Sequence, residues 1–404
     1  MWAIKAAACF DGERFLQDGV TVLVEGEQII GVEPLAHDVP DGCEVTTYGG
    51  TVLPGLIDAH VHLVAEGTLP GTQGSLELAG TLDDDALDAA LTRSLAVQAT
   101  AGVTTVRDLG DRGYRTLVAR DRRSPGEPRI VAAGPPLTTP GGHCHFLGGV
   151  VEGVDAVRAS VRAHVDRGVD VIKVMASGGM LTLGTDLLGT QFTLDEMRTA
   201  VEATHEAGLR IVAHCHSEAG ARHAVAAGVD GLEHATLLTG DGIAIPEDLI
   251  EEIARSGITV DPTLGFDPDR VVPLEEAPPH VRAVVQQLGL TPVEVAVRRA
   301  SQVQRLRATG VRVVSGLDAG AAPAKPHGGV WRAVVRLLDA GYSTSEALVT
   351  ATSVAADDCG LGGTTGRLAA GYDADVLVVD GDLSTDLGAL SRPVDVIIRG
   401  LTVL

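Results

Sequence analysis

Two histidines, His60 and His62, stand in the apolar segment LIDAHVHL. Alternate side chains of a strand point to the same face, so both imidazoles would project together. Neutral imidazole is a common ligand of zinc and other transition metals. A His-x-His pair alone fits a structural role equally well, so the pair is only a first candidate for a metal site.

Lys173 lies in the apolar segment VIKVM. An unpaired ammonium is costly in such a setting and must either find a partner or lose its charge. Only three of the 31 Lys and Arg residues are lysines, so lysine here is an unusual choice. It either reaches a carboxylate on a neighbouring strand or performs chemistry that arginine cannot.

Three further segments end in residues that could bind a metal. His214 and His216 alternate in RIVAHCHS, His234 closes GLEHAT, and Asp318 follows SGL. For each residue alone a structural role is as good an explanation, capping in the case of Asp318. Because five separate segments deliver such residues at the same end, we expect one shared metal site.

Glycine-rich loops carry the remaining candidates. His143 and His145 lie in TTPGGHCHFLGG, and Lys325 and His327 lie in AKPHGG. We expect the histidines to contact a substrate, and His327 with Lys325 to recognise an anionic group; solvated loop residues are the alternative. Arg107, with the neighbouring Asp108, is explained by a buried salt bridge or a loop cap.

The elements that must position these residues alternate between short β-branched runs and longer amphipathic stretches. This pattern is typical of repeated βα units and a parallel sheet. The eight expected strands are 56–63, 103–110, 129–134, 170–177, 210–217, 230–236, 258–264 and 311–320, with helices at 86–100, 153–167, 193–207, 246–255 and 291–308. We therefore predict an α/β fold, a (β/α)₈ TIM-type barrel over residues 53–364, with an open doubly wound sheet as the alternative. Catalytic residues of such barrels lie at the carboxyl ends of the strands.

The two ends of the chain have a different pattern, with strand-like runs and no long helices between them. We predict that residues 1–52 and 365–404 together form a small β-sandwich domain. Within the barrel, loops 134–152, 177–192 and 263–290 are long enough to cover an active site.

Composition excludes several classes of protein. The formal net charge of −23 disfavours nucleic acid and anionic membranes as partners. The sequence has no apolar run near the roughly 18 residues of a membrane span and no signal peptide, so we expect a cytoplasmic protein. Its five scattered cysteines favour free thiols over disulfides. The oligomeric state stays open, a homo-oligomer included.

The motifs PGLIDAHVHL, VIKVMASGG, IVAHCHS, GLEHATLL and SGLDAG, with the tail GRLAAGYDADVLVVDGD, resemble those of the amidohydrolase superfamily. The resemblance spans nearly the whole chain. ASGG after Lys173 and GGH at 141–143 are similar to the branch of imidazolonepropionase-related proteins and prolidase-like dipeptidases.

The resemblance implies a site for two divalent metal ions. His60 and His62 would bind the more buried ion, and His214 and His234 the more exposed one. Lys173 would bridge them as a carbamate formed with CO₂. Asp318 would be a further ligand and would shuttle the proton of a bridging hydroxide. Imidazole and carboxylate ligands suit Zn²⁺.

The same resemblance implies hydrolysis of an amide bond in a small molecule, a dipeptide or an N-acyl amino acid. His143 would stabilise the oxyanion, and His216 replaces a tyrosine that commonly holds the substrate carboxylate in the dipeptidases. Alternatives are a cyclic amide hydrolase of the lactam or imidazolone type and an aminohydrolase. A different class of function is an inactive barrel that serves as a binding scaffold.

Overall fold

Eight parallel segments pair in succession around a ring, as the computed structural model shows for residues 1–16, 18–68, 74–277, 279–289 and 291–404. One sheet runs β6-β7-β8, and another contains β9, β10, β11 and β13. The bridges Leu137 to Val174, Val260 to Val313 and Val61 to Ala319 connect them. The strands are β6 Leu56–Val61, β7 Val103–Asp108, β8 Arg129–Ala132, β9 Val171–Met175, β10 Arg210–Ser217, β11 Gly231–Thr239 and β13 Thr259–Asp261, with β12 Gly242–Ile243 as a short antiparallel addition.

Seven of the eight expected strands form as predicted, but segment 311–320 does not become a regular strand. It makes only isolated bridges to β13 and β6. Gly316 packs directly on His60, where a Cβ would lie 2.5 Å from the Cβ of His60, and Asp318 has a φ of 63°. Close packing and a left-handed residue interrupt the regular ladder here.

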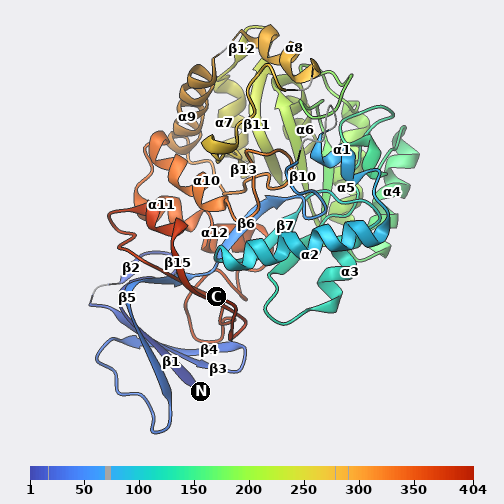
Figure 1. The fold of residues 1–404 in the computed structure, drawn as a ribbon. Helices are drawn as coiled ribbons and strands as arrows, with labels where there is room; N and C mark the ends of the chain where they lie inside the picture. Colours follow the sequence, from blue (N-terminus) through green and yellow to red (C-terminus); the bar gives the residue numbers. More distant parts are fainter. Residues whose placement is uncertain (17, 69–73, 278, 290) are drawn as a thin grey trace.

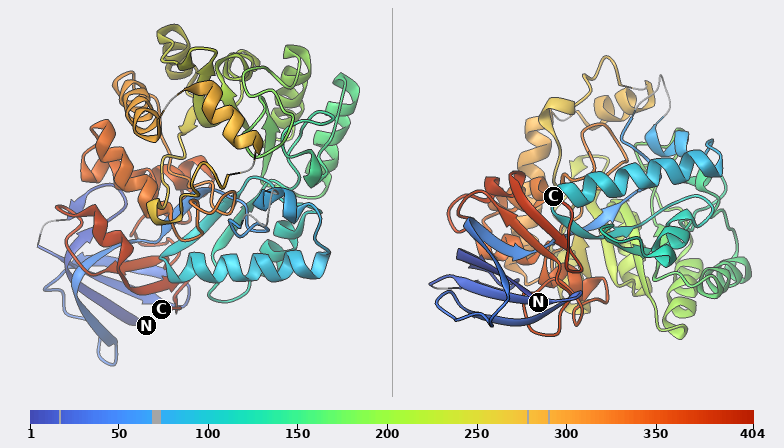
Figure 2. Two further views of the ribbon diagram at one scale, coloured as in Figure 1. Left: turned by 45° about the horizontal axis from the view of Figure 1, so that its top comes forward. Right: turned by 60° about the horizontal axis from the view of Figure 1, so that its bottom comes forward.

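Helices surround this ring on the outside (Figures 1 and 2). The five predicted helices are present with ends within two residues of the predicted ones: α2 Asp84–Thr100, α4 Val154–Asp166, α5 Leu194–Glu206, α7 Glu247–Ser256 and α9 Pro292–Ala308. Thr193 and Thr291 begin α5 and α9 with capping boxes, as their sequences favour. The others are α1 Ser75–Ala79, α3 Arg115–Arg122, α6 Glu218–Ala227, α8 Pro279–Leu288, α10 Val330–Arg336, α11 Thr344–Val349 and α12 Ser353–Asp358, with 3₁₀ turns at His145–Leu147, Pro268–Arg270, Leu337–Ala340 and Leu387–Ser391.

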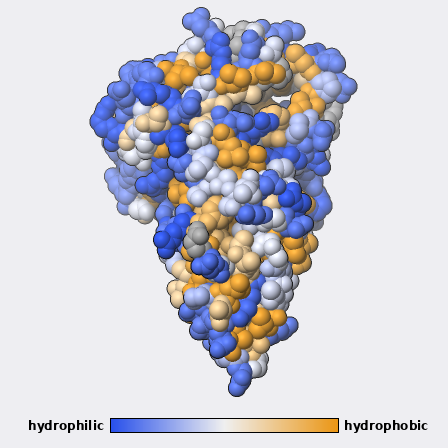
Figure 3. Space-filling view, turned by 90° about the vertical axis from the view of Figure 1, so that its left-hand side faces the viewer, coloured by the Kyte–Doolittle hydropathy of each residue, from blue (hydrophilic) through white to orange (hydrophobic). Residues whose placement is uncertain are grey.

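Both ends of the chain contribute to a third, eight-stranded sheet. Its order is β16-β15-β14-β5-β1-β3-β4, with β2 paired to β1. Figure 2 shows the C-terminal strands beside the N-terminal ones, and this sheet forms the narrow end of the molecule in Figure 3. The strands are β1 Trp2–Phe10, β2 Phe15–Leu16, β3 Val20–Glu25, β4 Gln28–Pro34, β5 Glu44–Pro54, β14 Val376–Val379, β15 Pro393–Ile398 and β16 Leu401–Thr402.

The terminal strands form one continuous sheet instead of the two stacked sheets of the expected sandwich. The long strand β5 pairs with β1 along most of its length and with β14 at its end. Ile4, Val22, Val52 and Val376, from four strands of this sheet, belong to one buried cluster. A sheet that curls around its own apolar face needs no second sheet to cover it.

The predicted covering loops differ in content. Loops 134–152 and 177–192 are largely irregular, whereas 263–290 includes α8 and a 3₁₀ turn, with residues 278 and 290 outside the described ones. Among the described helices, none has the length and apolar character that crossing a membrane requires.

Candidate metal centre and active site

One cavity of about 500 Å³ opens at the carboxyl ends of the barrel strands. All six predicted ligands lie on its wall: His60, His62, Lys173, His214, His234 and Asp318. His143 and His216 line it as well. His145 and His327 do not line it, so the structure brings eight of the ten predicted site residues together.

The first group of possible ligands consists of His60, His62 and Asp318, whose ring nitrogens and carboxylate oxygen lie within 4.8 Å of one another. Asp318 Oδ1 is 3.3 Å from His62 Nε2 and 3.6 Å from His60 Nε2. His62 Nδ1 donates to the Gly110 carbonyl oxygen at 3.0 Å, and His60 Nδ1 contacts Glu233 Oε2 at 2.7 Å. Oxygen partners thus fix both rings so that each Nε2 faces the cavity, the arrangement of metal-binding histidines.

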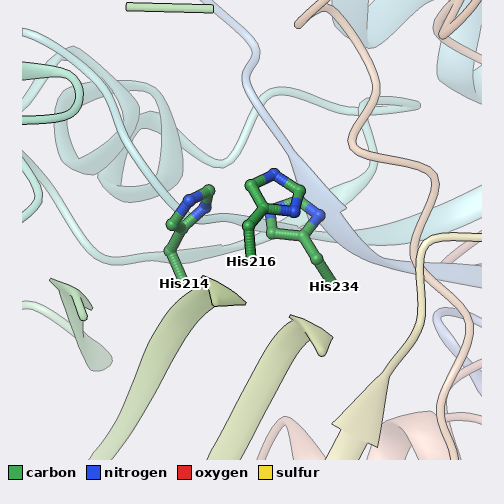
Figure 4. A group of neighbouring side chains, drawn as sticks. All are labelled: His214, His216 and His234. Atoms are coloured by element: carbon green, nitrogen blue, oxygen red, sulfur yellow. The ribbon is translucent and has the colours of Figure 1, made fainter. Parts of the chain in front are cut away.

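The second group consists of His214, His216 and His234, also within 4.8 Å of one another (Figure 4). His214 Nε2 donates to the Gly178 carbonyl oxygen at 3.1 Å. His216 and His234 each use Nδ1, bonded to Thr236 Oγ1 at 2.9 Å and to Thr263 Oγ1 at 3.0 Å. In each of these three rings the other nitrogen has no hydrogen-bond partner among the described residues.

Burial keeps most of these histidines neutral. It is the largest cause that lowers the pKa of His60, His214 and His234 well below the ordinary value, and the pKa of His216 to about 4. For His62, burial is outweighed by the hydrogen bond and charge of Asp318, which raise its pKa. Neutral imidazole is the form that binds a metal.

Lys173 is 2% exposed, and its Nζ has no hydrogen-bond partner among the described residues. Burial lowers the pKa of this ammonium. Its charge also contributes to the lowered pKa of His60 in the first group and of His214 and His234 in the second. A buried, unpartnered nitrogen near both groups fits a residue whose partner is a bound group.

Two ligand positions have strained backbones. His234 and Asp318 have φ angles of 65° and 63°, in the left-handed region that costs a non-glycine residue about 1–3 kcal/mol. Arg299 of α9 holds the first of them, donating to the His234 and Pro262 carbonyl oxygens at 2.6 Å each. Arg299 was not predicted from the sequence, because it lies 65 residues from His234 along the chain and only the fold brings the two together.

A paired cluster of buried charges lies behind His60. Arg107 donates to Asp358 Oδ2 at 2.8 Å, to Glu233 Oε1 at 3.3 Å and to the Ala59 carbonyl oxygen at 2.8 Å. The buried salt bridge predicted for Arg107 is confirmed, and the side chain of Asp108 accepts from loop amides as a cap. The contact of Glu233 with His60 was missed, although Glu233 precedes a predicted ligand.

His143 leans over the second group, with ring centroids 4.5 Å from His214. Its Nδ1 bonds to Thr182 Oγ1 at 2.8 Å, which leaves Nε2 for the cavity. Gly179 provides the space, since a Cβ there would lie 2.4 Å from His143 Cε1. Burial lowers the pKa of His143 well below its ordinary value, so the ring is neutral and can donate one hydrogen bond.

The two histidines outside the cavity are hydrogen-bonded to backbone carbonyl oxygens. His145 is exposed and bonds through Nδ1 to the Gly142 carbonyl oxygen at 2.9 Å. His327 Nε2 donates to the Ala65 carbonyl oxygen at 2.8 Å, while the neighbouring Lys325 lines the cavity. Substrate contact by His145 and His327 stays a prediction without support from this arrangement.

Sequence comparison places the chain among known hydrolases. The model of the Amidohydrolase family matches residues 51–403. An uncharacterized protein of Mycobacterium tuberculosis is 28% identical over 396 residues, which cover 94% of this chain and 90% of that protein. Ochratoxinase of Aspergillus niger is 25% identical, over 92% of this chain and 79% of the relative.

Solved structures of amidohydrolases are similar to this chain over almost its whole length. A Xaa-Pro dipeptidase with methionine in its active site has a TM-score of 0.83 and 25% identity, with 99% of this chain and 98% of the other covered. A prolidase in complex with N-methylphosphonate-L-proline has a TM-score of 0.80 and 26% identity, with the same coverage. Members of this family generally use divalent metals, and the two ligand groups with the unpartnered Lys173 fit such ions. The chain belongs to the amidohydrolase family, in its prolidase-like branch, and is a hydrolase acting on C–N bonds.

Proposed function

We propose that this protein is a binuclear metal-dependent hydrolase that cleaves the amide bond of dipeptides or N-acyl amino acids. The carrying observation is the side chain of Lys173, which is buried, has no hydrogen-bond partner among the described residues and lies on the cavity wall that both ligand groups share. The relatives solved with methionine and with a proline derivative support amino-acid compounds as substrates.

We propose the following ligand roles, with which the two groups are compatible. His60 and His62 would hold the more buried ion, His214 and His234 the more exposed one, and Asp318 would complete the first group. Lys173 would bridge the ions as a carbamate, because an unprotonated amine can add CO₂ with release of one proton and then offers two oxygens that share one negative charge. Nitrogen and oxygen ligands of this kind favour Zn²⁺.

Bound divalent ions would supply an activated water and polarise the substrate carbonyl. His143 donates from Nε2 to the carbonyl oxygen as negative charge develops there. Asp318 accepts a proton at its carboxylate and passes it to the departing nitrogen. The cavity walls exclude bulk water and hold the amide between these two side chains.

We further propose that the chain divides into a barrel of residues 53–364 and a terminal β domain of 1–52 with 365–404. The single curled sheet shared by both ends supports this division.

Metal analysis combined with a substrate screen tests the proposed function. Protein prepared with zinc and bicarbonate should hold two metal equivalents and hydrolyse dipeptides or N-acyl amino acids. Activity on lactams alone would replace the substrate class. Less than one equivalent, with no turnover of any amide, would favour a binding scaffold instead.

A further inference from the structure

Besides Lys173, the cavity wall includes a second lysine, Lys325, which lies in the loop between the eighth barrel segment and α10. Its Nζ donates a single hydrogen bond, to the Thr263 carbonyl oxygen at 2.7 Å. Among the described residues, no carboxylate oxygen lies within the 4.0 Å of an ion pair with this ammonium. The other two N–H donors of this ammonium have no hydrogen-bond partner among the described residues.

The acidic groups nearest to Lys325 do not neutralise it. Asp318 is engaged with the imidazoles of the first ligand group, His62 at 3.3 Å. Asp261 accepts the Thr263 amide at 2.9 Å, so one of its carboxylate oxygens is engaged with the backbone.

A further positive charge strengthens the same side of the cavity. Arg299 is buried beside the carbonyl oxygens of His234 and Pro262, and burial lowers its pKa only to about 10, so it stays charged at neutral pH. Its donors are occupied by protein oxygens, whereas those of Lys325 are not. Of these two cations, Lys325 therefore has N–H donors that a bound group could use.

The rest of the cavity is largely apolar. Its wall includes Met180, Leu181, Leu238, Ile243, Phe266 and Val295. Apolar walls with a few placed polar groups are typical of small-molecule sites, in which the polar groups fix orientation.

We propose that Lys325 binds the carboxylate of the substrate and that the apolar wall favours an apolar side chain beside that carboxylate. This inference rests on the proposed amide hydrolysis. An anionic oxygen at Nζ satisfies the unused donors through charge-assisted hydrogen bonds, and the apolar wall receives the neighbouring side chain.

Two matched substrates test the contact, N-acetyl-L-leucine and N-acetyl-3-methylbutylamine, which share the scissile amide and differ in the carboxylate. Wild type should prefer the carboxylate. Lys325→Met should raise KM for N-acetyl-L-leucine by roughly 10- to 100-fold, leave the amine derivative unchanged and leave metal content intact. Lys325→Arg should restore much of the preference.

Arg336→Met is the matched control, because Arg336 also lines the cavity but already pairs with Asp339 at 3.1 Å. It should keep the preference for the carboxylate. If Lys325→Met and Arg336→Met lost the preference for the carboxylate equally, the total charge of the cavity would explain the preference. That result would overturn a direct contact with Lys325. A wild type indifferent to the carboxylate would overturn it as well.

Binding separates this inference from the proposed function. Calorimetric titration of the zinc-loaded protein with L-leucine and with 3-methylbutylamine needs no turnover. Weaker binding of L-leucine to Lys325→Met alone supports the carboxylate contact even if no amide is cleaved, in which case only the proposed function fails. Equal L-leucine affinity in both proteins overturns the contact.

Discussion

Two cationic side chains of this barrel, Arg107 and Lys173, are equally buried but differ in their hydrogen-bond partners. Arg107 and Lys173 are each 2% exposed. The guanidinium of Arg107 meets Asp358, Glu233 and a carbonyl oxygen, whereas the ammonium of Lys173 has no partner among the described residues. A protein tolerates an unpaired buried charge at a cost in stability, and function is the usual reason. The difference indicates that Arg107 serves the fold and that Lys173 serves the chemistry.

Removing Lys173 should have the largest effect on activity. Lys173→Ala should lower bound metal and reduce kcat by roughly 10³-fold, because several kcal/mol of charge stabilisation depend on the ions. Metal analysis and steady-state kinetics measure both. Lys173→Met should leave the metal-free protein at least as stable as wild type, since the ammonium has no partner to lose. Full metal and full turnover in either variant would remove the bridging role.

Removing Arg107 should have the largest effect on stability. Arg107→Met leaves Glu233 buried without a cation and Asp358 with Arg210 alone, which should lower the free energy of unfolding by about 3–5 kcal/mol. Urea denaturation followed by circular dichroism measures this. The control is Arg93→Met, which breaks the exposed pair with Glu66 and should leave the denaturation midpoint nearly unchanged. An equal loss of stability in Arg107→Met and Arg93→Met would contradict a structural role for the buried Arg107 ion pairs.

His143→Ala should reduce kcat by roughly 10²- to 10³-fold with metal content unchanged, because an oxyanion donor is lost. His145→Ala is the neighbouring control, an exposed ring outside the cavity, and should keep its activity. Comparable losses in the two variants would show that the loop, not the Nε2 donor, determines the rate.

Glu233 connects Arg107 to the first ligand group, since one carboxylate oxygen contacts Arg107 and the other contacts His60. Glu233→Gln should weaken metal binding by roughly 10- to 100-fold, because the amide supports the His60 ring less well than a carboxylate does. Competition with a chelator measures this affinity. Unchanged affinity would mean that Glu233 belongs to the fold alone.

The sequence predicted the barrel elements well where local pattern determines them. β-branched runs and capping residues mark β7, β10, α5 and α9, and their predicted ends agree closely with the structure. The pattern failed at segment 311–320, where close packing of Gly316 on His60 replaces a regular ladder. Local periodicity contains no information about such packing.

Loop residues were the least predictable part of the site. His143 and His145 are two positions apart in one glycine-rich loop, yet only His143 lines the cavity, because the chain turns at Cys144 between them, where φ is 58°. Likewise Lys325 lines the cavity and His327 does not. Contacts from distant elements, such as Arg299 to the His234 carbonyl oxygen, had no signal at all.

By itself, the sequence determined which residue types the strands deliver to one end of the barrel, because alternation along a strand and the common direction of parallel strands are local properties. The tertiary structure decided which of these side chains stay without a partner. The roles of Lys173, Glu233 and Lys325 depend on the residues that surround them, and those residues come from segments far apart in the chain.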